Sequence, residues 1–352
     1  MIRFGFSCLP AVSFSECAEL AKECEKNGYD AFWVADEIWY RDPWQVMTVC
    51  SAATEKIRIA TGVTHMYLRN PAFLAQSLAT IDEISSGRAV CGISIGNKVM
   101  LDQCNVEVKR PMIALVEAVK IIRTLLAGEV LNFDGEFFHY EGVSLKVKTV
   151  QRKLPIFVGA KSGPRSFQVA GELGDGAILT DIYSPEWAKA AIGGIKEGFA
   201  AAKRTGKEVE NYEVASWTLV GIHPDEKVAR NIARPIVAFY LPTHFKRQLE
   251  VSGVDPSLQA EISSEIAAGR YGNAIRKTTD DVVAKLSITG TPAQVAEKLS
   301  RVSKEGIDHF VIAPADNLTL MNLGLGDYRV TNALDATEAL RLIEKDVMPR
   351  VN

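Results

Sequence analysis

Short apolar runs alternate with amphipathic stretches along almost the whole chain. The apolar runs are rich in β-branched and aromatic residues, which is typical of buried strands. The stretches between them repeat their apolar positions every three or four residues, which predicts helices that cover a sheet. The predicted strands are residues 2–8, 31–35, 57–63, 89–94, 155–159, 177–180, 212–222 and 309–313.

Capping patterns mark the beginnings of several predicted helices. Ser13 and Glu16 form a capping box before a helix that runs to about residue 26. Asp42 and Asn70 each stand directly before a proline, which places a capping side chain next to proline at the first helical position. The other predicted helices are residues 111–127, 164–173, 185–202, 225–240, 291–305 and 335–345.

This alternation predicts an α/β fold with an all-parallel sheet, because each buried strand is paired with a helix. A doubly wound open sheet would alternate in the same way. Eight strand–helix units in a chain of 352 residues favour the closed (β/α)8 TIM barrel. In addition, residues 2–8 are not followed by the G-x-G-x-x-G pattern of an open dinucleotide-binding sheet.

Three segments interrupt the alternation within what we interpret as a single TIM-barrel domain, residues 1–352. Residues 129–147 predict a hairpin-like insertion. Residues 241–290 are charged and predict a helical insertion over the barrel mouth, as a lid or a dimer contact. Residues 317–352 form a C-terminal extension.

The charge balance narrows the range of partners. The chain has 40 Lys and Arg residues against 43 Asp and Glu residues, which argues against nucleic acid. No apolar stretch approaches the roughly 18–20 residues that span a bilayer, and the first residues have no signal-peptide pattern. We therefore expect a cytoplasmic protein with a small-molecule substrate and no membrane partner.

The cysteines predict no disulfide framework and no metal site. None of them forms a CxxC pair, and no Cys/His spacing is typical of zinc. We expect reduced, buried thiols that pack as small apolar side chains. They are Cys8, Cys17, Cys24, Cys50, Cys91 and Cys104.

The ends of the predicted strands supply the candidate functional residues, because a TIM barrel builds its active site from the loops at the carboxyl ends of its strands. The candidates are Ser7, Asp36, Glu37, Thr61, Gly62, Val63, His65, Ser94, Gly96, Asn97, Lys98, Gly159, Ala160, Lys161, Ser162, Gly163 and Thr180.

The loop after the fifth strand is a candidate phosphate site. It is rich in glycine, carries Lys161, Ser162 and Arg165, and opens a helix whose free N–H groups attract an anion. Residues 92–97 offer a second set of free amides, which favours a phosphate-bearing cofactor across the barrel mouth. The alternative is that Gly163-Pro164 is only a helix-start turn.

Three side chains are candidates for catalysis or cofactor contact. Asp36 and Glu37 end an apolar strand, although Asp36 as a helix cap is an alternative. His65 is a candidate for polarising a cofactor carbonyl, against the alternative of a hydrogen-bonded structural histidine.

The chain also carries F-G-F at residues 4–6, A-F-W-V-A-D at 31–36, I-A-T-G-V-T at 59–64 and G-I-S-I-G at 92–96. These segments resemble the bacterial-luciferase-like superfamily. P-I-F-V-G-A at 155–160, with residues 170–177, is most similar to the methylenetetrahydromethanopterin reductase branch.

The resemblance implies a TIM barrel whose mouth binds FMN or its deazaflavin analogue, coenzyme F420, for hydride transfer. It also implies a cis peptide bond between Gly62 and Val63, behind the cofactor ring, and a cofactor phosphate near Gly159 and Ala160. The residues expected around the ring or its side chain are Ser94, Gly96 and Asn97.

Three residues depart from the family pattern at positions that face the substrate. Ser7 stands where the branch tends to carry Glu, Glu37 where His follows the aspartate of the second strand, and Asn97 where an acidic residue is expected. Tyr240, at the start of the long insertion, is a further candidate for substrate binding.

The favoured hypothesis is an F420-dependent oxidoreductase that transfers a hydride to an electrophilic carbon, with Glu37 or, failing that, His65 handling the proton. Lys98, Lys109 and Arg110 favour F420, because its tail carries several carboxylates. An FMN-dependent luciferase-like monooxygenase and a non-catalytic flavin-binding relative are the alternatives. We expect no metal ion, and a homodimer or homotetramer.

Overall fold

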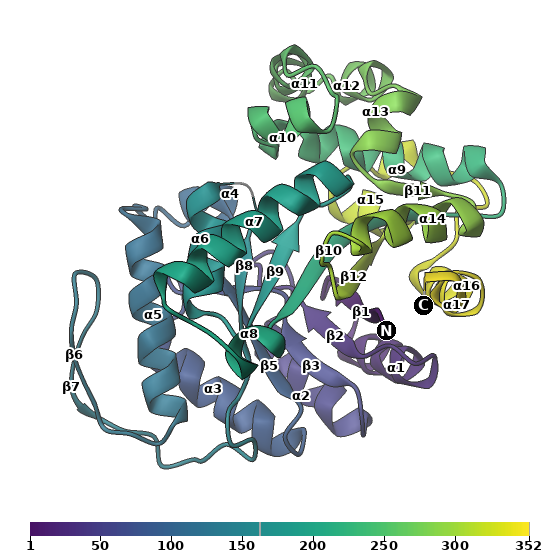
Figure 1. Ribbon diagram of the computed structural model, residues 1–352. Coiled ribbons are helices and arrows are strands. Elements are labelled where there is room, and N and C mark those ends of the chain that lie inside the picture. Colours follow the sequence, from purple (N-terminus) through teal and green to yellow (C-terminus); the bar gives the residue numbers. More distant parts are fainter. Residues whose placement is uncertain (162, 352) are drawn as a thin grey trace. The chain divides into compact units, whose positions relative to one another are not determined.

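The computed structural model describes residues 1–161 and 163–351. Its fold is the α/β TIM barrel of eight parallel strands with helices, which confirms the predicted fold class (Figure 1). The barrel strands are β1 (Arg3–Cys8), β2 (Ala31–Val34), β3 (Arg58–Thr61), β5 (Ala89–Ser94), β8 (Ile156–Ala160), β9 (Gly176–Thr180), β10 (Glu213–Ile222) and β12 (His309–Pro314).

The chain divides into two compact units, which are described separately. The β2–β8 unit comprises Gly5–Ile178 and Gly194–Glu213. The β10–β12 unit comprises Met1–Phe4, Leu179–Gly193 and Val214–Asn352.

In the β2–β8 unit, parallel pairing runs from β1 through β2, β3 and β5 to β8. Phe6 stacks on Phe32 of the next strand at 6.1 Å, and Trp33 meets Phe157 edge-on at 5.5 Å. All four rings are buried, so aromatic packing forms much of this core. The helices of this part are α1 (Phe14–Lys26), α2 (Pro43–Ala53), α3 (Pro71–Ile84), α4 (Lys98–Gln103), α5 (Pro111–Leu126), α6 (Pro164–Leu173) and α8 (Lys207–Glu210), and α7 (Pro185–Ala201) spans the division.

The capping patterns are confirmed. Ser13 and Glu16 form the capping box of α1, and the side chains of Asp42 and Asn70 accept backbone N–H groups at the starts of α2 and α3. The short helix α4 was not predicted. With six residues it is too short to show a helical period, and its cap, Asn97, had been assigned to a loop.

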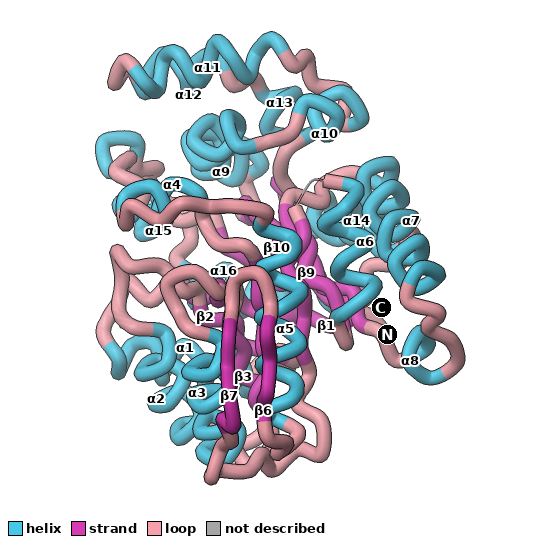
Figure 2. The backbone as a smooth tube through the Cα atoms, turned by 90° about the vertical axis from the view of Figure 1, so that its left-hand side faces the viewer, coloured by secondary structure: helices cyan, strands magenta, loops and turns pink. Residues whose placement is uncertain are grey.

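The predicted insertion 129–147 contains a two-stranded antiparallel hairpin, β6 (Leu131–Asp134) and β7 (His139–Val143), seen in Figure 2. Its turn is held by one buried carboxylate on α5. Glu117 Oε1 accepts the N–H of Glu136 at 2.6 Å, and Oε2 accepts those of Phe137 and Phe138 at 3.0 and 3.3 Å. The hairpin is therefore fixed at its tip.

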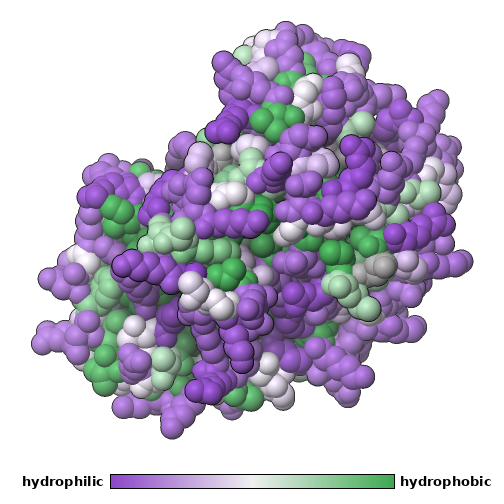
Figure 3. Space-filling view, in the orientation of Figure 1, coloured by the Kyte–Doolittle hydropathy of each residue, from purple (hydrophilic) through white to green (hydrophobic). Residues whose placement is uncertain are grey.

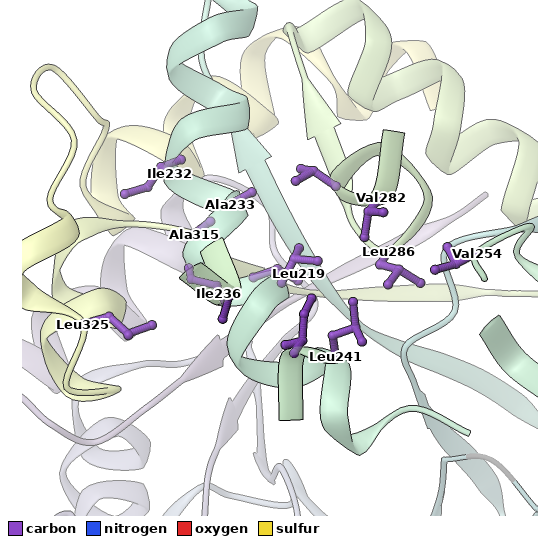
Figure 4. Close-up of a cluster of buried hydrophobic side chains, with 14 of the residues drawn as sticks. Leu219, Ile232, Ala233, Ile236, Leu241, Val254, Val282, Leu286, Ala315 and Leu325 are labelled. Atoms are coloured by element: carbon purple, nitrogen blue, oxygen red, sulfur yellow. The ribbon is translucent and has the colours of Figure 1, made fainter. Parts of the chain in front are cut away.

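In the β10–β12 unit, β10 pairs in parallel with β12 and with the short strand β11 (Ile288–Gly290). A cluster of buried apolar side chains packs here, with Leu219 of β10 close to Ile236 and Leu241 (Figure 4). The helices are α9 (Glu226–Tyr240), α10 (Lys246–Val251), α11 (Ser257–Ala267), α12 (Tyr271–Lys277), α13 (Asp280–Lys285), α14 (Pro292–Ser303), α15 (Asn317–Asn322), α16 (Ala336–Asp346) and α17 (Met348–Val351), with 3-10 turns η1 (Leu241–Thr243) and η2 (Gly326–Tyr328).

The long insertion is helical as predicted, in the form of α10 to α13, and the predicted helix 335–345 matches α16. The cysteines are free; five are buried, whereas Cys104 is partly exposed. None of the described helices has the length and apolar character to cross a membrane. The face of the molecule in Figure 3 is largely hydrophilic, with separate small apolar areas.

Candidate functional site

The third predicted strand is interrupted. Instead of one strand over 57–63, β3 ends at Thr61 and a two-residue strand, β4 (Thr64–His65), follows. The peptide bond between Gly62 and Val63 is cis, which confirms the prediction from the resemblance. Thr61 Oγ1 donates to the carbonyl oxygen of Gly92 and accepts its N–H, both at 2.8 Å, so a side chain links the bulge to β5.

Close packing around this bulge requires glycine at several positions. A Cβ on Gly92 would overlap the carbonyl oxygen of Thr61, and one on Gly62 would lie 2.8 Å from Trp33 Cβ. A Cβ on Gly159 would lie 2.8 Å from Ser94 Cβ. The strand ends that carry the candidate residues therefore approach one another more closely than side chains at these positions would allow.

Asp36 is buried and fully engaged. Arg69 binds it with Nε to Oδ2 at 2.7 Å and Nη2 to Oδ1 at 2.9 Å, and Thr64 Oγ1 donates to Oδ2 at 2.6 Å. Arg69 also contacts Asp42 at 3.0 Å. Asp36 is therefore part of a bidentate ion pair that ties the end of β2 to β4 and to the segment before α3.

Glu37 has a different environment from its neighbour. Its side chain is half-buried, and Asn97 Nδ2 donates to Oε1 at 3.2 Å. Burial raises the pKa of the Glu37 carboxyl, the negative charge of Asp36 raises it further, and the hydrogen bond from Asn97 opposes both. Trp39 Nε1 also donates to Oε1 of Gln103 at 2.8 Å. This hydrogen bond and the one from Asn97 link the segment after β2 to α4 and its N-cap.

His65 is buried at the end of β4, opposite Ser94 of β5. Burial lowers the pKa of its imidazole, the charge of Asp36 opposes this, and Arg69 adds to it. Its Nδ1 has no hydrogen-bond partner among the described residues. A neutral imidazole with an unsatisfied buried nitrogen is a group that a bound ligand can complete.

Gly96 closes over this histidine. It has a φ of +90°, and a Cβ there would lie 3.2 Å from His65 Cβ. Its N–H donates to Ser94 Oγ at 3.2 Å. The loop after β5 thus lies directly against His65.

The loop after β8 leads into α6 without a capping side chain. Gly163 is the N-cap residue, and among the described residues no side chain caps the first N–H groups of this helix. Arg165 forms an ion pair with Glu172 at 2.5 Å, so its side chain lies along α6. The expectation that Arg165 adds positive charge at the start of this helix is therefore wrong. Ala160 is buried, Lys161 is partly buried, and Ser162 lies outside the described residues.

The three cations that favoured F420 in the sequence are each neutralised by an acidic neighbour. Lys98 pairs with Asp102 at 2.7 Å, and the other two pairs, Lys109–Glu107 and Arg110–Glu136, measure 2.8 and 2.6 Å. All six side chains are largely exposed, so these ion pairs contribute little. They do not distinguish between the two cofactors.

The remaining candidates are on different elements. Ser7 is partly buried in β1, beside Trp33 in the strand register. In the β10–β12 unit, Thr180 ends β9, and its buried Oγ1 has no partner among the described residues. Tyr240 ends α9, with its ring edge-on to Trp217 at 6.4 Å and to Phe239 at 5.3 Å.

Sequence reasoning missed Arg69, which links Asp36 to Asp42. The only indication of this role in the sequence is the position of Arg69 directly before the Asn70-Pro71 helix start, close to the end of a predicted strand. No spacing rule connects an arginine to an aspartate thirty-three residues earlier, so only the fold identifies the pair.

The sequence matches the family described as luciferase-like monooxygenase over residues 2–309, and the chain belongs to this family. A protein of Archaeoglobus fulgidus named 5,10-methylenetetrahydromethanopterin reductase is 30% identical, over 99% of this chain and 100% of its own. An F420-dependent glucose-6-phosphate dehydrogenase of Microbacterium testaceum is 25% identical, over 99% of this chain and 97% of its own.

The solved structure of the coenzyme F420-dependent tetrahydromethanopterin reductase of Methanopyrus kandleri has a similar fold. The TM-score is 0.88 at 26% sequence identity, and the match covers 100% of this chain and 99% of that structure.

Proposed function

We infer that this chain is an F420-dependent oxidoreductase, and we propose that Glu37 handles the proton of its reaction. The full-length similarity to F420-dependent reductases supports the class and the cofactor. The observation that carries the role of Glu37 is its half-buried carboxyl, with a raised pKa and a single hydrogen bond from Asn97.

Two features of the described residues fit such a cofactor. The unsatisfied Nδ1 of His65 needs a partner, and the start of α6 at Gly163 lacks a capping side chain where a phosphate would bind. We propose that His65 contacts the ring system and that Gly159 and Gly163 lie beside the phosphate. Further proposed contacts are Thr61, Gly62, Val63, Ser94, Gly96, Asn97, Lys98, Ala160, Lys161, Ser162 and Thr180.

We assign Asp36 a positioning role. Both of its oxygens bind Arg69, and one also accepts Thr64, so it holds β4 and hence His65 in place.

The cofactor supplies the hydride chemistry when it is bound. The chain supplies orientation and the proton. Because burial favours the neutral carboxyl, Glu37 can donate its proton to the heteroatom whose bond to the hydride-accepting carbon breaks as the new C–H bond forms. Asn97 occupies Oε1 and leaves Oε2 for the substrate. We propose a methylene-pterin-like substrate, contacted by Glu37, Ser7 and Tyr240.

The test compares Glu37→Gln with His65→Gln. Glu37→Gln keeps the size and shape of the side chain but removes the acidic proton of the carboxyl. We therefore expect kcat for F420 turnover to fall by about 100-fold or more, with an unchanged Kd for F420. The His65 variant should instead weaken F420 binding. If Glu37→Gln retains full kcat, Glu37 is not the proton donor; if the wild-type protein prefers FMN to F420, the proposed cofactor is wrong.

We also propose that the chain works in the cytoplasm as a homodimer or homotetramer. Light scattering of the purified protein measures the mass of the assembly, and a monomer at micromolar concentration would contradict this proposal.

A further inference from the structure

A cavity with charged side chains lies in the β10–β12 unit, and none of its lining residues is among those proposed for the cofactor. It has a volume of about 230 Å³, and α9, β11 and α14 supply most of its walls. β11 contacts both helices. The charged side chains that line it are Glu226, Arg230, Glu297, Lys298 and Arg301.

Lys298 is half-buried in this cavity and has no ion-pair partner among the described residues. Its Nζ donates to the carbonyl oxygens of Thr289 at 2.9 Å and Ala284 at 3.5 Å. Within the described part of the chain, no carboxylate comes within ion-pair distance of this ammonium group. Two neutral carbonyls accept two of its three N–H bonds, which leaves the third for a ligand.

The electrostatic surroundings of Lys298 agree with this. Burial lowers the pKa of the ammonium group; Glu226 and Glu297 oppose the effect, and Arg230 and Arg301 add to it. A bound anion would reverse the balance by favouring the charged form.

The two arginines of the cavity differ in their partners. Arg230 is satisfied by Glu226 at 3.0 Å and Asp280 at 2.9 Å. Arg301 forms no ion pair or hydrogen bond with any described residue. Lys298 and Arg301 stand one turn apart on α14 and both line the cavity. Lys298 has one N–H bond left for a ligand, and the exposed Arg301 has its guanidinium donors left.

We propose that this cavity binds a phosphate group, either inorganic phosphate or the phosphate of a monoester, at a site separate from that of the cofactor. The phosphate charge of about −2 near neutral pH matches the two cations of the cavity that have no ion-pair partner. Arg301 provides paired N–H donors for two phosphate oxygens, and Lys298 provides a point charge at the inner end. Glu297, on the exposed side of α14, disfavours larger polyanions by repulsion.

The experiment is calorimetric titration of the full chain, free of F420, with inorganic phosphate and separately with glycerol phosphate. We expect saturable binding at one site per chain. Lys298→Met and Arg301→Met should each weaken binding by about tenfold or more, because each removes a charge-assisted hydrogen bond. Lys298→Arg keeps the charge and should retain most of the affinity.

Lys120→Met is the matched control, because Lys120 is an exposed lysine of α5 with the same charge and no place in the cavity. It should bind phosphate as the wild type does. Tighter binding of glycerol phosphate than of inorganic phosphate would identify a monoester as the ligand, and the reverse order would identify free phosphate; both support the site.

Three results would overturn the proposal. They are no saturable binding of either ligand, equal binding by wild type and both methionine variants, and a parallel loss of F420 affinity in those variants. The last would assign the cavity to the cofactor. The readout here is phosphate binding and not turnover. The phosphate site can therefore fail its test while Glu37 remains the proton donor, and Glu37 can fail its test while the phosphate site remains.

Discussion

Two charged regions of the molecule differ in how their charges are satisfied. In the cluster of Asp36, Arg69 and Asp42, each charge has a partner of opposite sign, since Arg69 binds both carboxylates. Around Lys298, the ammonium group has only neutral carbonyl partners. The first arrangement holds strand ends in place. The second leaves charge available, and that difference distinguishes a structural cluster from a candidate binding site.

The largest effect should come from breaking the satisfied cluster. Asp36→Ala removes the carboxylate and leaves Arg69 with only Asp42 in a partly buried position, so we expect a loss of about 3 kcal/mol in the free energy of unfolding. Urea denaturation measures this loss. F420 binding should weaken too, because Thr64 and His65 lose their support.

The control for this variant is Asp102→Ala, which breaks the exposed pair with Lys98. It should change stability by no more than about 0.5 kcal/mol. Equal losses in the two variants would mean that the Asp36 cluster is no more structural than a surface ion pair.

A smaller effect is expected from filling the close contact behind the bulge. In Gly92→Ala the new methyl group meets the backbone carbonyl of Thr61, which cannot rotate away, so we expect a loss of about 2 kcal/mol. Thermal unfolding measures it. Gly193→Ala, on an exposed face of α7 with no atom near the new methyl group, should instead stabilise by about 0.5 kcal/mol. A tolerated alanine at position 92 would contradict the packing argument.

The smallest effect concerns Asn97. Its hydrogen bond lowers the pKa of Glu37, so Asn97→Ala should raise that pKa further. If Glu37 acts in its protonated form, the pH above which kcat falls should then be higher in the variant. The value of kcat at its optimum should fall by about threefold, because the Glu37 carboxyl is less well oriented. The pH profile of kcat separates this from a structural defect, which would lower the whole curve without moving it.

The sequence allowed the fold to be predicted because the alternation of strands and helices is regular and their caps are local. Ser13, Asp42 and Asn70 cap helices through neighbours two or three residues away, and such contacts are visible in a linear sequence. Most candidate residues could then be chosen from their positions at the carboxyl ends of the predicted barrel strands.

The roles of these residues were harder to predict, because they depend on long-range partners. Asp36 and Glu37 are adjacent in sequence, yet one is bound by Arg69 and the other faces Asn97. The sequence suggests that three cations can bind the carboxylates of F420, but each pairs with an acidic side chain in the structure. They are Lys98, Lys109 and Arg110. Short helices such as α4 escaped prediction because one and a half turns show no period.

The long helical insertion begins where α9 ends and returns at β11, and these two elements contact each other. Each doubling of the length of such a segment costs only about 0.6 kcal/mol of closure entropy. We therefore expect a change in the length of this segment to cost little stability and to leave β10 and β11 paired as they are.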